Sequence, residues 1–280
     1  MTDAPGSLYI VATPIGNFGD ISQRAVEVLE RADLVAAEDT RHSLKLLNHL
    51  GIQAKLRSVH EHNEREIAPR LLALMDEGQD IALISDAGTP LISDPGYHLV
   101  AQARNAGLKV IPIPGPSALI AALSVCGLPT DRFTFEGFLP HKSAARRAVL
   151  EKLVGETRTL VFYESSHRIE KSLADMAEVL GVDREATLAR ELTKRFETIH
   201  QGSLSELVLW LQDDDQQQKG EFVVVVKGAQ ESIRTSADEV DRLLRILMEE
   251  LPLKQAAGLA AKLTGDKKNR LYQRALELRE

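Results

Sequence analysis

Residues 81–96 have the sequence IALISDAGTPLISDPG, in which a short apolar run passes directly into a loop of glycines, prolines and two aspartates. A continuous apolar run bounded by turn formers is typical of a strand buried in a parallel sheet. In open parallel sheets, ligands bind beyond the carboxyl ends of the strands, which is where this loop falls. Glycine lets a backbone approach a ligand closely, and proline stiffens its path. The stretch therefore predicts an α/β fold with a ligand-binding loop at residues 85–96.

Two more loops of similar composition follow apolar strands elsewhere in the first half of the chain. Residues 13–20 (TPIGNFGD) come after a strand expected at 8–12, and residues 112–118 (PIPGPSA) come after one expected at 110–113. The first of these is equally compatible with a plain turn. Three such loops at equivalent strand ends favour a ligand crevice over three unrelated turns.

Strands and helices alternate through residues 1–116. Beside the three strands already given, we expect strands at 34–37 and 55–59 and helices at 22–32, 41–50, 63–77 and 96–106. This alternation with short connections predicts a parallel sheet with helices on both faces.

The pattern changes after residue 116. Residues 128–142 are rich in turn formers, and strands follow one another without an intervening helix, which predicts a mixed sheet. The expected strands are 159–163, 186–190, 195–201 and 221–227, and the expected helices are 117–126, 143–154, 167–180 and 203–211. From residue 232 the pattern is helical, with candidate helices at 236–249, 253–263 and 267–278. We therefore expect two α/β domains, 1–116 and 117–230, and a helical tail, 231–280, whose last two helices have helix-turn-helix spacing.

Composition narrows the class of protein. The 280 residues include 34 Lys and Arg against 41 Asp and Glu, a net charge of −7, so RNA contacts would need local basic patches. The single cysteine, Cys126, excludes a disulfide framework and is expected to pack in an apolar helix. No apolar run approaches the ~18–20 residues of a membrane helix, and the N-terminus lacks the basic segment of a signal peptide. We expect a soluble cytoplasmic protein without a membrane partner.

Several catalytic motifs are absent. The chain has no G-x-x-x-x-G-K-[ST], no G-x-G-x-x-G after its first strand, no H-E-x-x-H and no G-x-S-x-G. His60-Glu61-His62 suggests a metal site only weakly, and a polar loop is the better interpretation. We expect no metal.

The loop sequences resemble the tetrapyrrole methylase family. VATPIGNFGDIS, AEDTRHSLKLL, SDAGTPLISDPG and PGPSA carry the resemblance, and the third is its most specific element. The first is less specific, because tetrapyrrole-making relatives carry a more glycine-rich version. FEGFLPHK, FYESSHR, ARELTKRFE, KGEFVVVV and the C-terminal QAAGLAAKLTGDKKNRLYQRALEL resemble the branch that modifies ribosomal RNA. The resemblance extends over essentially the whole chain.

This resemblance implies an S-adenosylmethionine-dependent methyltransferase whose cofactor lies in a cleft between two α/β domains. It implies a homodimer that methylates the 2′-oxygen of cytidine 1402 in the 16S ribosomal RNA of the small ribosomal subunit. Matching motif to motif, the expected cofactor contacts are Pro14, Ile15, Asp86, Ala87, Gly88, Ile92, Ser117, Ala118, Glu164, Leu192, Glu221 and Phe222.

A ribose hydroxyl is a poor nucleophile until its proton moves, so a nearby base would accelerate the reaction. Glu38 is the first candidate, because related methylases have a working acid at the end of the second strand. His60 and Asp39 are the next candidates. Glu38 and Asp39 have an alternative role as caps of the helix that begins near Arg41.

RNA binding requires positive charge. The candidate contacts are Arg41, Lys142, Arg146, Arg147, Arg168, Arg190, Lys194, Lys267, Lys268 and Arg270. Between residues 254 and 279, seven basic residues face two acidic ones. A basic segment of this kind is also compatible with a solvated helix pair.

Two other functions compete with RNA methylation. One is methylation of a tetrapyrrole or another small molecule, which would leave the basic loop near residue 142 and the basic tail without a purpose. The other is a non-catalytic RNA-binding factor in ribosome assembly, which the intact loops at 85–96 and 112–118 disfavour. Methyl transfer to small subunits, to naked RNA and to uroporphyrinogen discriminates among the three.

Overall fold

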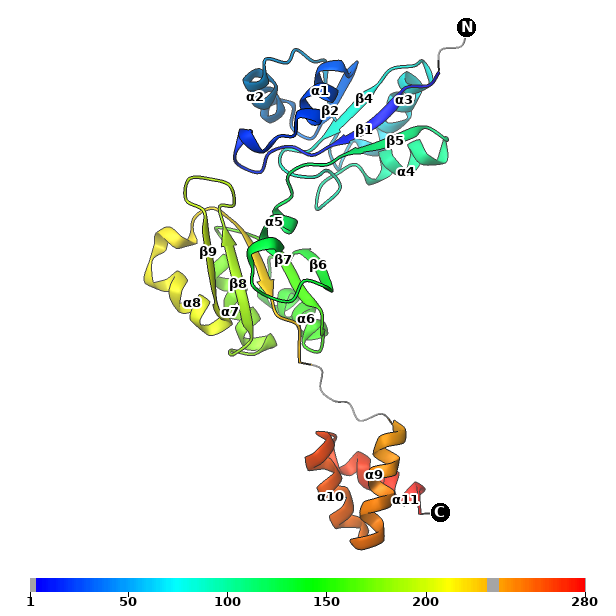
Figure 1. The fold of residues 1–280 in the computed structure, drawn as a ribbon, viewed down its shortest axis with the longest axis vertical. Helices are drawn as coiled ribbons and strands as arrows, with labels where there is room; N and C mark the ends of the chain where they lie inside the picture. The colour runs from blue at the N-terminus through cyan, green and yellow to red at the C-terminus, as the bar shows by residue number, and fades with distance from the viewer. Residues whose placement is uncertain (1–3, 231–236, 280) are drawn as a thin grey trace. The chain divides into compact units, whose positions relative to one another are not determined.

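The computed structural model describes residues 4–230 and 237–279. The chain divides into two compact units, the first ending at Gly228 and the second beginning at Ala229. Figure 1 draws both, and each is described here by itself. The first unit holds two five-stranded sheets with their helices. Because both sheets belong to one compact unit, the domain boundary placed at residue 116 stays a prediction.

The first sheet is parallel throughout and has the strand order β3-β2-β4-β1-β5. Its strands are β1 (Ser7–Val11), β2 (Leu34–Ala37), β3 (Leu56–Ser58), β4 (Ile81–Ile84) and β5 (Lys109–Ile113). The accompanying helices are η1 (Phe18–Asp20), α1 (Gln23–Arg31), α2 (Thr40–Leu50), α3 (Glu64–Asp76) and α4 (Tyr97–Asn105). The α/β class with a parallel first sheet is confirmed, and all four expected helices are present.

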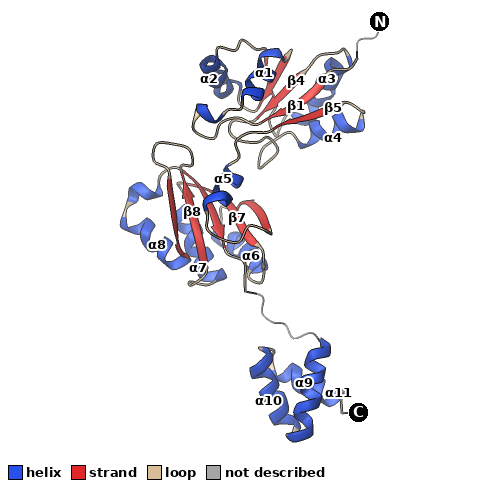
Figure 2. Ribbon diagram, in the orientation of Figure 1, coloured by secondary structure: helices blue, strands red, loops and turns tan. Residues whose placement is uncertain are grey.

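The central strand β4 shows why this sequence forms a sheet covered on both faces. Ile81 and Leu83 pack among side chains of α3 and α4, whereas Ala82 and Ile84 pack among those of α1 and α2. Figure 2 shows these two pairs of helices on different sides of the sheet. Successive side chains of a strand point to opposite faces, so an unbroken apolar run satisfies both layers. Each fully buried large aliphatic side chain contributes ~1.5–3 kcal/mol.

The second sheet is mixed and has the order β6-β7-β10-β8-β9, with only β6 and β7 parallel. Its strands are β6 (Phe133–Phe138), β7 (Thr159–Ser165), β8 (Glu185–Arg190), β9 (Thr198–Ser203) and β10 (Glu221–Val226). The accompanying helices are α5 (Ala118–Val125), α6 (Ser143–Leu153), α7 (Ile169–Leu180), α8 (Leu204–Asp213) and η2 (Asp215–Gln218). Side chains of α6, α7 and α8 share one apolar cluster with this sheet, and those of α5 share another.

Strand β6 lies within residues 128–142, which are rich in turn formers and in which no strand was expected. It is an edge strand paired only with β7, and its register shifts between Phe135 and Gly137. Gly137 has φ +63°, a left-handed conformation that suits glycine at a bulge. The expected strands omit β6 because the turn formers flank a short aromatic strand, Phe133–Phe138, and hide its pattern.

A buried ion cluster joins α6 to α7. Asp175 accepts hydrogen bonds from Arg146 Nε and Arg147 Nε, both at 2.7 Å, and from Ser143 Oγ. Only 3% of the Arg146 side chain and 7% of the Asp175 side chain are exposed. Burial disfavours the charged carboxylate, yet the bonds from Arg147, Ser143 and Arg146 outweigh burial and lower the pKa of Asp175.

We expect Asp175→Ala to lower the free energy of unfolding by about 3–5 kcal/mol, because it leaves the buried Arg146 guanidinium without its carboxylate. Chemical denaturation measures this loss. The matched control is Glu178→Ala, which removes a solvent-exposed partner of Arg147 and should barely move the midpoint. Equal midpoints for the two variants would contradict the structural role of the cluster.

The second unit contains α9 (Ala237–Glu250), α10 (Leu253–Thr264) and α11 (Lys268–Glu277). Leu244, Ala257 and Leu271 belong to a small core shared by the three helices. Gly265 ends α10 in the left-handed conformation, with φ +72°, and lets the chain turn into α11. The helical tail and its last turn agree with the expectation from sequence, although its expected start at residue 236 lies outside the described residues.

No helix in the described part of the chain is long and apolar enough to cross a membrane.

Candidate active site

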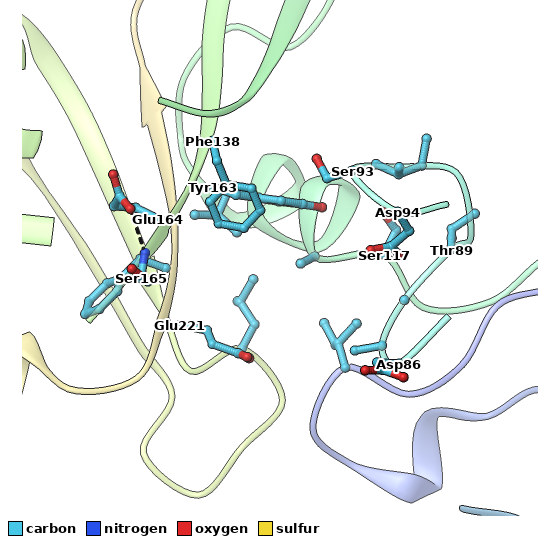
Figure 3. A pocket seen from close by; sticks show the side chains of 18 of the residues that line it. Asp86, Thr89, Ser93, Asp94, Ser117, Phe138, Tyr163, Glu164, Ser165 and Glu221 are labelled. Atoms are coloured by element: carbon cyan, nitrogen blue, oxygen red, sulfur yellow. Dashed lines mark hydrogen bonds between the residues drawn. The ribbon is translucent and has the colours of Figure 1, made fainter. Parts of the chain in front are cut away.

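A cavity of about 370 Å³ lies in the first unit, between loops that leave the first sheet and the face of the second sheet that α5 covers (Figure 3). Its acidic and basic lining residues are Glu38, Asp86, Asp94, Glu164, Glu221 and Lys194. The remaining lining residues are Ile15, Ala87, Gly88, Thr89, Ile92, Ser93, Ser117, Ala118, Phe138, Tyr163, Ser165, Ala189, Leu192, Phe222 and Val223. The loops 13–20, 85–96 and 112–118 all contribute to this set.

Backbone hydrogen bonds tie these three loops together. Thr13 N donates to Gly88 O at 2.8 Å, and Gly88 N donates back to Thr13 O at 3.0 Å. Thr89 Oγ1 donates to Pro116 O at 3.0 Å, which joins the third loop to the second. Gly88 has φ +83°, where an L side chain would be strained. The crevice inferred from the three strand ends is therefore a connected structure.

The second loop contains strained backbone next to the cavity. Leu91 and Ser93 have φ values of +74° and +65°, a conformation that non-glycine residues rarely adopt. Such residues cost free energy and cluster at binding sites, where surrounding structure holds them. Here the turns direct Ile92, Ser93 and Asp94 to the cavity.

Three cavity carboxylates have no cationic side-chain partner among the residues that the structure describes: Glu38, Asp86 and Asp94. Asp86 Oδ1 accepts a hydrogen bond from Asp39 N at 3.1 Å. Burial raises the pKa of Asp94 to about 6, with the charge of Asp86 adding to the effect and a hydrogen bond from Ser85 opposing it. Burial also raises the pKa of Glu38, followed by the charges of Asp94 and Asp86. These three acidic side chains therefore gather on one side of the cavity without a neighbouring lysine or arginine among the described residues to offset them.

The other two acidic residues of the cavity are neutralised. Glu164, 2% exposed, accepts hydrogen bonds from Ser172 Oγ at 2.5 Å and Arg168 Nη2 at 3.1 Å. Lys194 Nζ donates to Glu221 Oε2 at 2.7 Å and to Glu191 Oε1 at 2.8 Å. Figure 3 shows Glu164 and Glu221 across the cavity from Asp86 and Asp94. The unpaired negative charge is thus concentrated at the first sheet.

The side chain of Lys194 also packs against the first loop. A Cβ atom added to Gly16 would lie 2.4 Å from Lys194 Cγ, so the backbone at this position has no room for a side chain. Lys194 thereby connects the loop after β8 with the loop after β1, which explains the position of a lysine that sequence assigned to RNA.

Two aromatic residues of the second sheet complete the lining. Tyr163 Oη accepts a hydrogen bond from Leu119 N at 3.1 Å, and its ring packs edge-on with that of Phe138 at a centroid distance of 5.6 Å. Neither residue was expected at the site from the sequence. The signal for Phe138 was the aromatic residues in 133–138, which the turn formers around them obscured. Tyr163 lies in the strand that was expected at 159–163, next to Glu164.

The structure brings nearly all of the expected cofactor contacts to this cavity. Of that set, only Pro14 is absent from the lining. Residues that line the cavity without having been assigned to it are Thr89, Ser93, Asp94, Phe138, Tyr163, Ser165, Ala189 and Val223. Asp94 had been noticed only as one of two carboxylates in its loop. The cofactor roles themselves stay predictions.

Only the first of the three candidate bases lines the cavity. Glu38 is part of the lining, whereas Asp39 and His60 are not. Asp39 Oδ1 accepts a hydrogen bond from Arg41 N at 2.8 Å and caps α2, as the alternative interpretation had it. His60 N donates to Asn63 Oδ1 at 2.8 Å, within the turn that leads into α3. These positions favour Glu38.

Burial corrects part of the expected RNA surface. Arg146 is held by Asp175, and Arg190, 8% exposed, donates to the carbonyl groups of Lys219, Gln216 and Phe196. Arg168 and Arg147 also have carboxylate partners. Their guanidinium groups hold loops and helices in place. The sequence shows that these residues are basic, but it does not show whether they bind groups of the fold or phosphate groups of RNA. The exposed candidates are Arg41, Lys142, Lys267, Lys268 and Arg270.

Within residues 4–230 and 237–279, no group of three or more His, Cys, Asp or Glu side chains could hold a metal ion. The rings of His60 and His62 lie 6.1 Å apart, edge to face.

The fold and the cavity define the class of this protein. Residues 7–208 match the family model of the Tetrapyrrole (Corrin/Porphyrin) Methylases, and residues 234–279 match that of the RsmI C-terminal HTH domain. The chain belongs to the tetrapyrrole methylase family.

Particular relatives narrow this class. The chain is 55% identical to Ribosomal RNA small subunit methyltransferase I of Escherichia coli O157:H7, over 98% of this chain and 96% of that one. It is 57% identical to the protein of the same name from Pseudomonas aeruginosa, over 97% of both chains. The solved structure of uroporphyrin-III-C-methyltransferase from Thermus thermophilus superposes with a TM-score of 0.54 at 22% identity, over 79% of this chain and 94% of that one. This last likeness concerns the fold alone.

Proposed function

We propose that this protein is an S-adenosylmethionine-dependent methyltransferase that methylates the 2′-oxygen of a cytidine ribose in 16S ribosomal RNA. The observation that carries the proposal is the 55% identity to Ribosomal RNA small subunit methyltransferase I over nearly the whole chain, including the C-terminal helices. By the resemblance of its motifs, the target is cytidine 1402. Transfer of a labelled methyl group to unmethylated small ribosomal subunits tests it.

The cavity fits this cofactor chemically. S-adenosylmethionine carries a sulfonium, an ammonium and one carboxylate, so its net charge is positive, and Glu38, Asp86 and Asp94 supply unpaired negative charge. Ile15 and Leu192 supply apolar wall. When bound, the cofactor provides a methyl group already attached to a good leaving group. The chain's task is then to bind, to align the ribose oxygen and to keep water out.

Glu38 is the residue we propose to accept the ribose proton. Methyl transfer forms a carbon–oxygen bond and breaks a carbon–sulfur bond, and the hydroxyl proton must leave the oxygen. Burial and two neighbouring carboxylates raise the pKa of Glu38, which makes its carboxylate a better proton acceptor than an exposed glutamate. Asp94 and Asp86 therefore support the base as well as the cofactor.

The same resemblance supports a homodimer that works in the cytoplasm on the small ribosomal subunit. It also supports a division of the first unit at residue 116 into two α/β domains with the cofactor between them. Sedimentation of the purified protein measures the oligomeric state, for which we expect a dimer.

The basic residues that begin the last helix are expected to meet phosphate groups. Lys267, Lys268 and Arg270 are exposed, and replacing all three by alanine should weaken subunit binding and reduce its salt slope by about 0.7–0.9 for each phosphate group that is no longer neutralised. Binding measured at several salt concentrations gives the slope. The control trio is Lys55, Arg104 and Lys109, which are exposed basic residues just before β3, in α4 and in β5. Equal salt slopes of subunit binding for the two triple variants would mean that the tail does not contact RNA phosphate groups.

A further inference from the structure

Phe138 is an exposed aromatic side chain at the cavity. It is 54% exposed and at the same time lines the cavity. Singly exposed apolar side chains are common on protein surfaces. At the edge of a cavity, however, an exposed aromatic ring offers its face to a ligand that arrives from solvent. Figure 3 shows Phe138 beside Tyr163 at one end of the cavity.

The local structure holds Phe138 firmly in this position. It is the last residue of β6, directly after the bulge at Gly137, where an added Cβ would lie 3.4 Å from Ser93 Oγ. Leu139, which follows, is buried. The ring of Tyr163 packs against Phe138 at an interplanar angle of 64°. The ring of Phe138 is therefore held in place before a ligand arrives, so binding loses little conformational entropy of this side chain.

Hydrogen bonds from two arginines hold the backbone after Phe138, and this segment leads to an unpaired lysine. Arg168 donates to Leu139 O, and Arg146 Nη1 donates to Pro140 O and His141 O, each at 3.2 Å. Lys142 follows, exposed, and its ammonium has no carboxylate partner in the described part of the chain. These two arginines thus position a lysine that itself remains available.

We infer that Phe138 and Lys142 form a nucleotide subsite, in which a base of the RNA stacks on Phe138 and a backbone phosphate meets Lys142. The inference rests on the proposed function. Proteins that bind single-stranded RNA combine aromatic stacking surfaces with basic groups that follow the backbone. Phe138 and Lys142 match this combination, since they are an aromatic side chain and an unpaired lysine four residues apart on one hydrogen-bonded segment that begins at the cavity.

Four single variants test the subsite, with unmethylated small ribosomal subunits as substrate. Loss of one stacked base weakens binding by about 5- to 100-fold, so Phe138→Ala should lower kcat/KM and subunit affinity by that amount. Phe138→Tyr should retain activity within about threefold, because it keeps an aromatic face. Phe133→Ala is the matched control, since Phe133 is an exposed aromatic residue of the same strand outside the cavity lining. Lys142→Ala should reduce the salt slope of binding by about 0.7–0.9, which the Phe138 variants should not do.

Affinity for S-adenosylmethionine, measured by calorimetry, separates the subsite from the cofactor site. It should stay at the wild-type value in all four variants. A folded Phe138→Ala protein with unchanged subunit affinity and turnover would overturn the inference, and so would an equal loss of cofactor affinity, which would mean that Phe138 packs against the cofactor. If the wild-type protein binds subunits without methylating them, the proposed function fails while the binding data still test the subsite.

Discussion

Replacing Ala87 by arginine is expected to abolish binding of S-adenosylmethionine, raising its Kd by at least about 100-fold, or about 2.7 kcal/mol. Ala87 is exposed to the cavity and has no left-handed backbone, so the new side chain can be accommodated without refolding the loop. An arginine there fills part of a cavity of about 370 Å³. It also pairs with carboxylates such as Asp86 that would otherwise attract the cationic cofactor. Isothermal titration calorimetry measures the change.

The matched control for this prediction is Ala106→Arg, which adds the same side chain at an exposed alanine just after α4. Its cofactor affinity should equal that of the wild type. Gly88→Arg is a poorer test, because Gly88 has φ +83° and pairs with Thr13, so loss of binding could come from a distorted loop. Wild-type affinity in a folded Ala87→Arg protein would mean that the cofactor binds elsewhere.

The second large effect is expected from Glu38→Gln, which should lower turnover by about 100-fold or more and lower cofactor affinity by much less, because Asp86 and Asp94 remain. Glutamine keeps the size and polarity of the side chain but cannot accept the ribose proton. Single-turnover rates at saturating cofactor measure the effect. A loss below about threefold would remove Glu38 from the role of base.

The pH dependence of turnover gives this assignment an independent signature. Glu38 must be deprotonated to act, so turnover should rise with pH through the raised pKa of this group and reach its plateau above the usual range for glutamate. Asp94→Asn removes a negative charge that raises the pKa of Glu38, so the rise should move to lower pH. Asp39→Asn is the comparison variant. The charge of Asp39 raises the pKa of Glu38 less than that of Asp94 does, so its profile should move to lower pH by less than that of Asp94→Asn.

Sequence alone predicted the features that depend on local patterns. The apolar run at β4 has to be buried on both faces. The glycines and prolines that follow it are typical of a tight turn at the end of a strand. Similar reasoning applied to residues 13–20 and 112–118, and the three loops do meet at one cavity. The carboxyl ends of parallel strands lie at the same edge of a sheet, so three loops that follow such strands could be predicted to form one site.

Features that depend on tertiary partners could not be predicted in this way. Arg146 and Arg190 are of the residue type that binds phosphate groups, but both are held inside the fold. Asp175 pairs with Arg146, and three backbone carbonyl groups accept hydrogen bonds from Arg190. Strand β6 forms because β7 pairs with it, despite the bulge at Gly137. Phe138 and Tyr163 join the cavity only when the second sheet lies against the loops of the first.

The most direct test of the proposed function is transfer of a labelled methyl group from S-adenosylmethionine to small ribosomal subunits from cells that lack this enzyme, with naked ribosomal RNA and uroporphyrinogen III tested alongside. We expect label in 16S ribosomal RNA, on the ribose 2′-oxygen of a single cytidine, and none in uroporphyrinogen. Absence of label from both forms of the RNA, or transfer to uroporphyrinogen instead, would contradict the proposal.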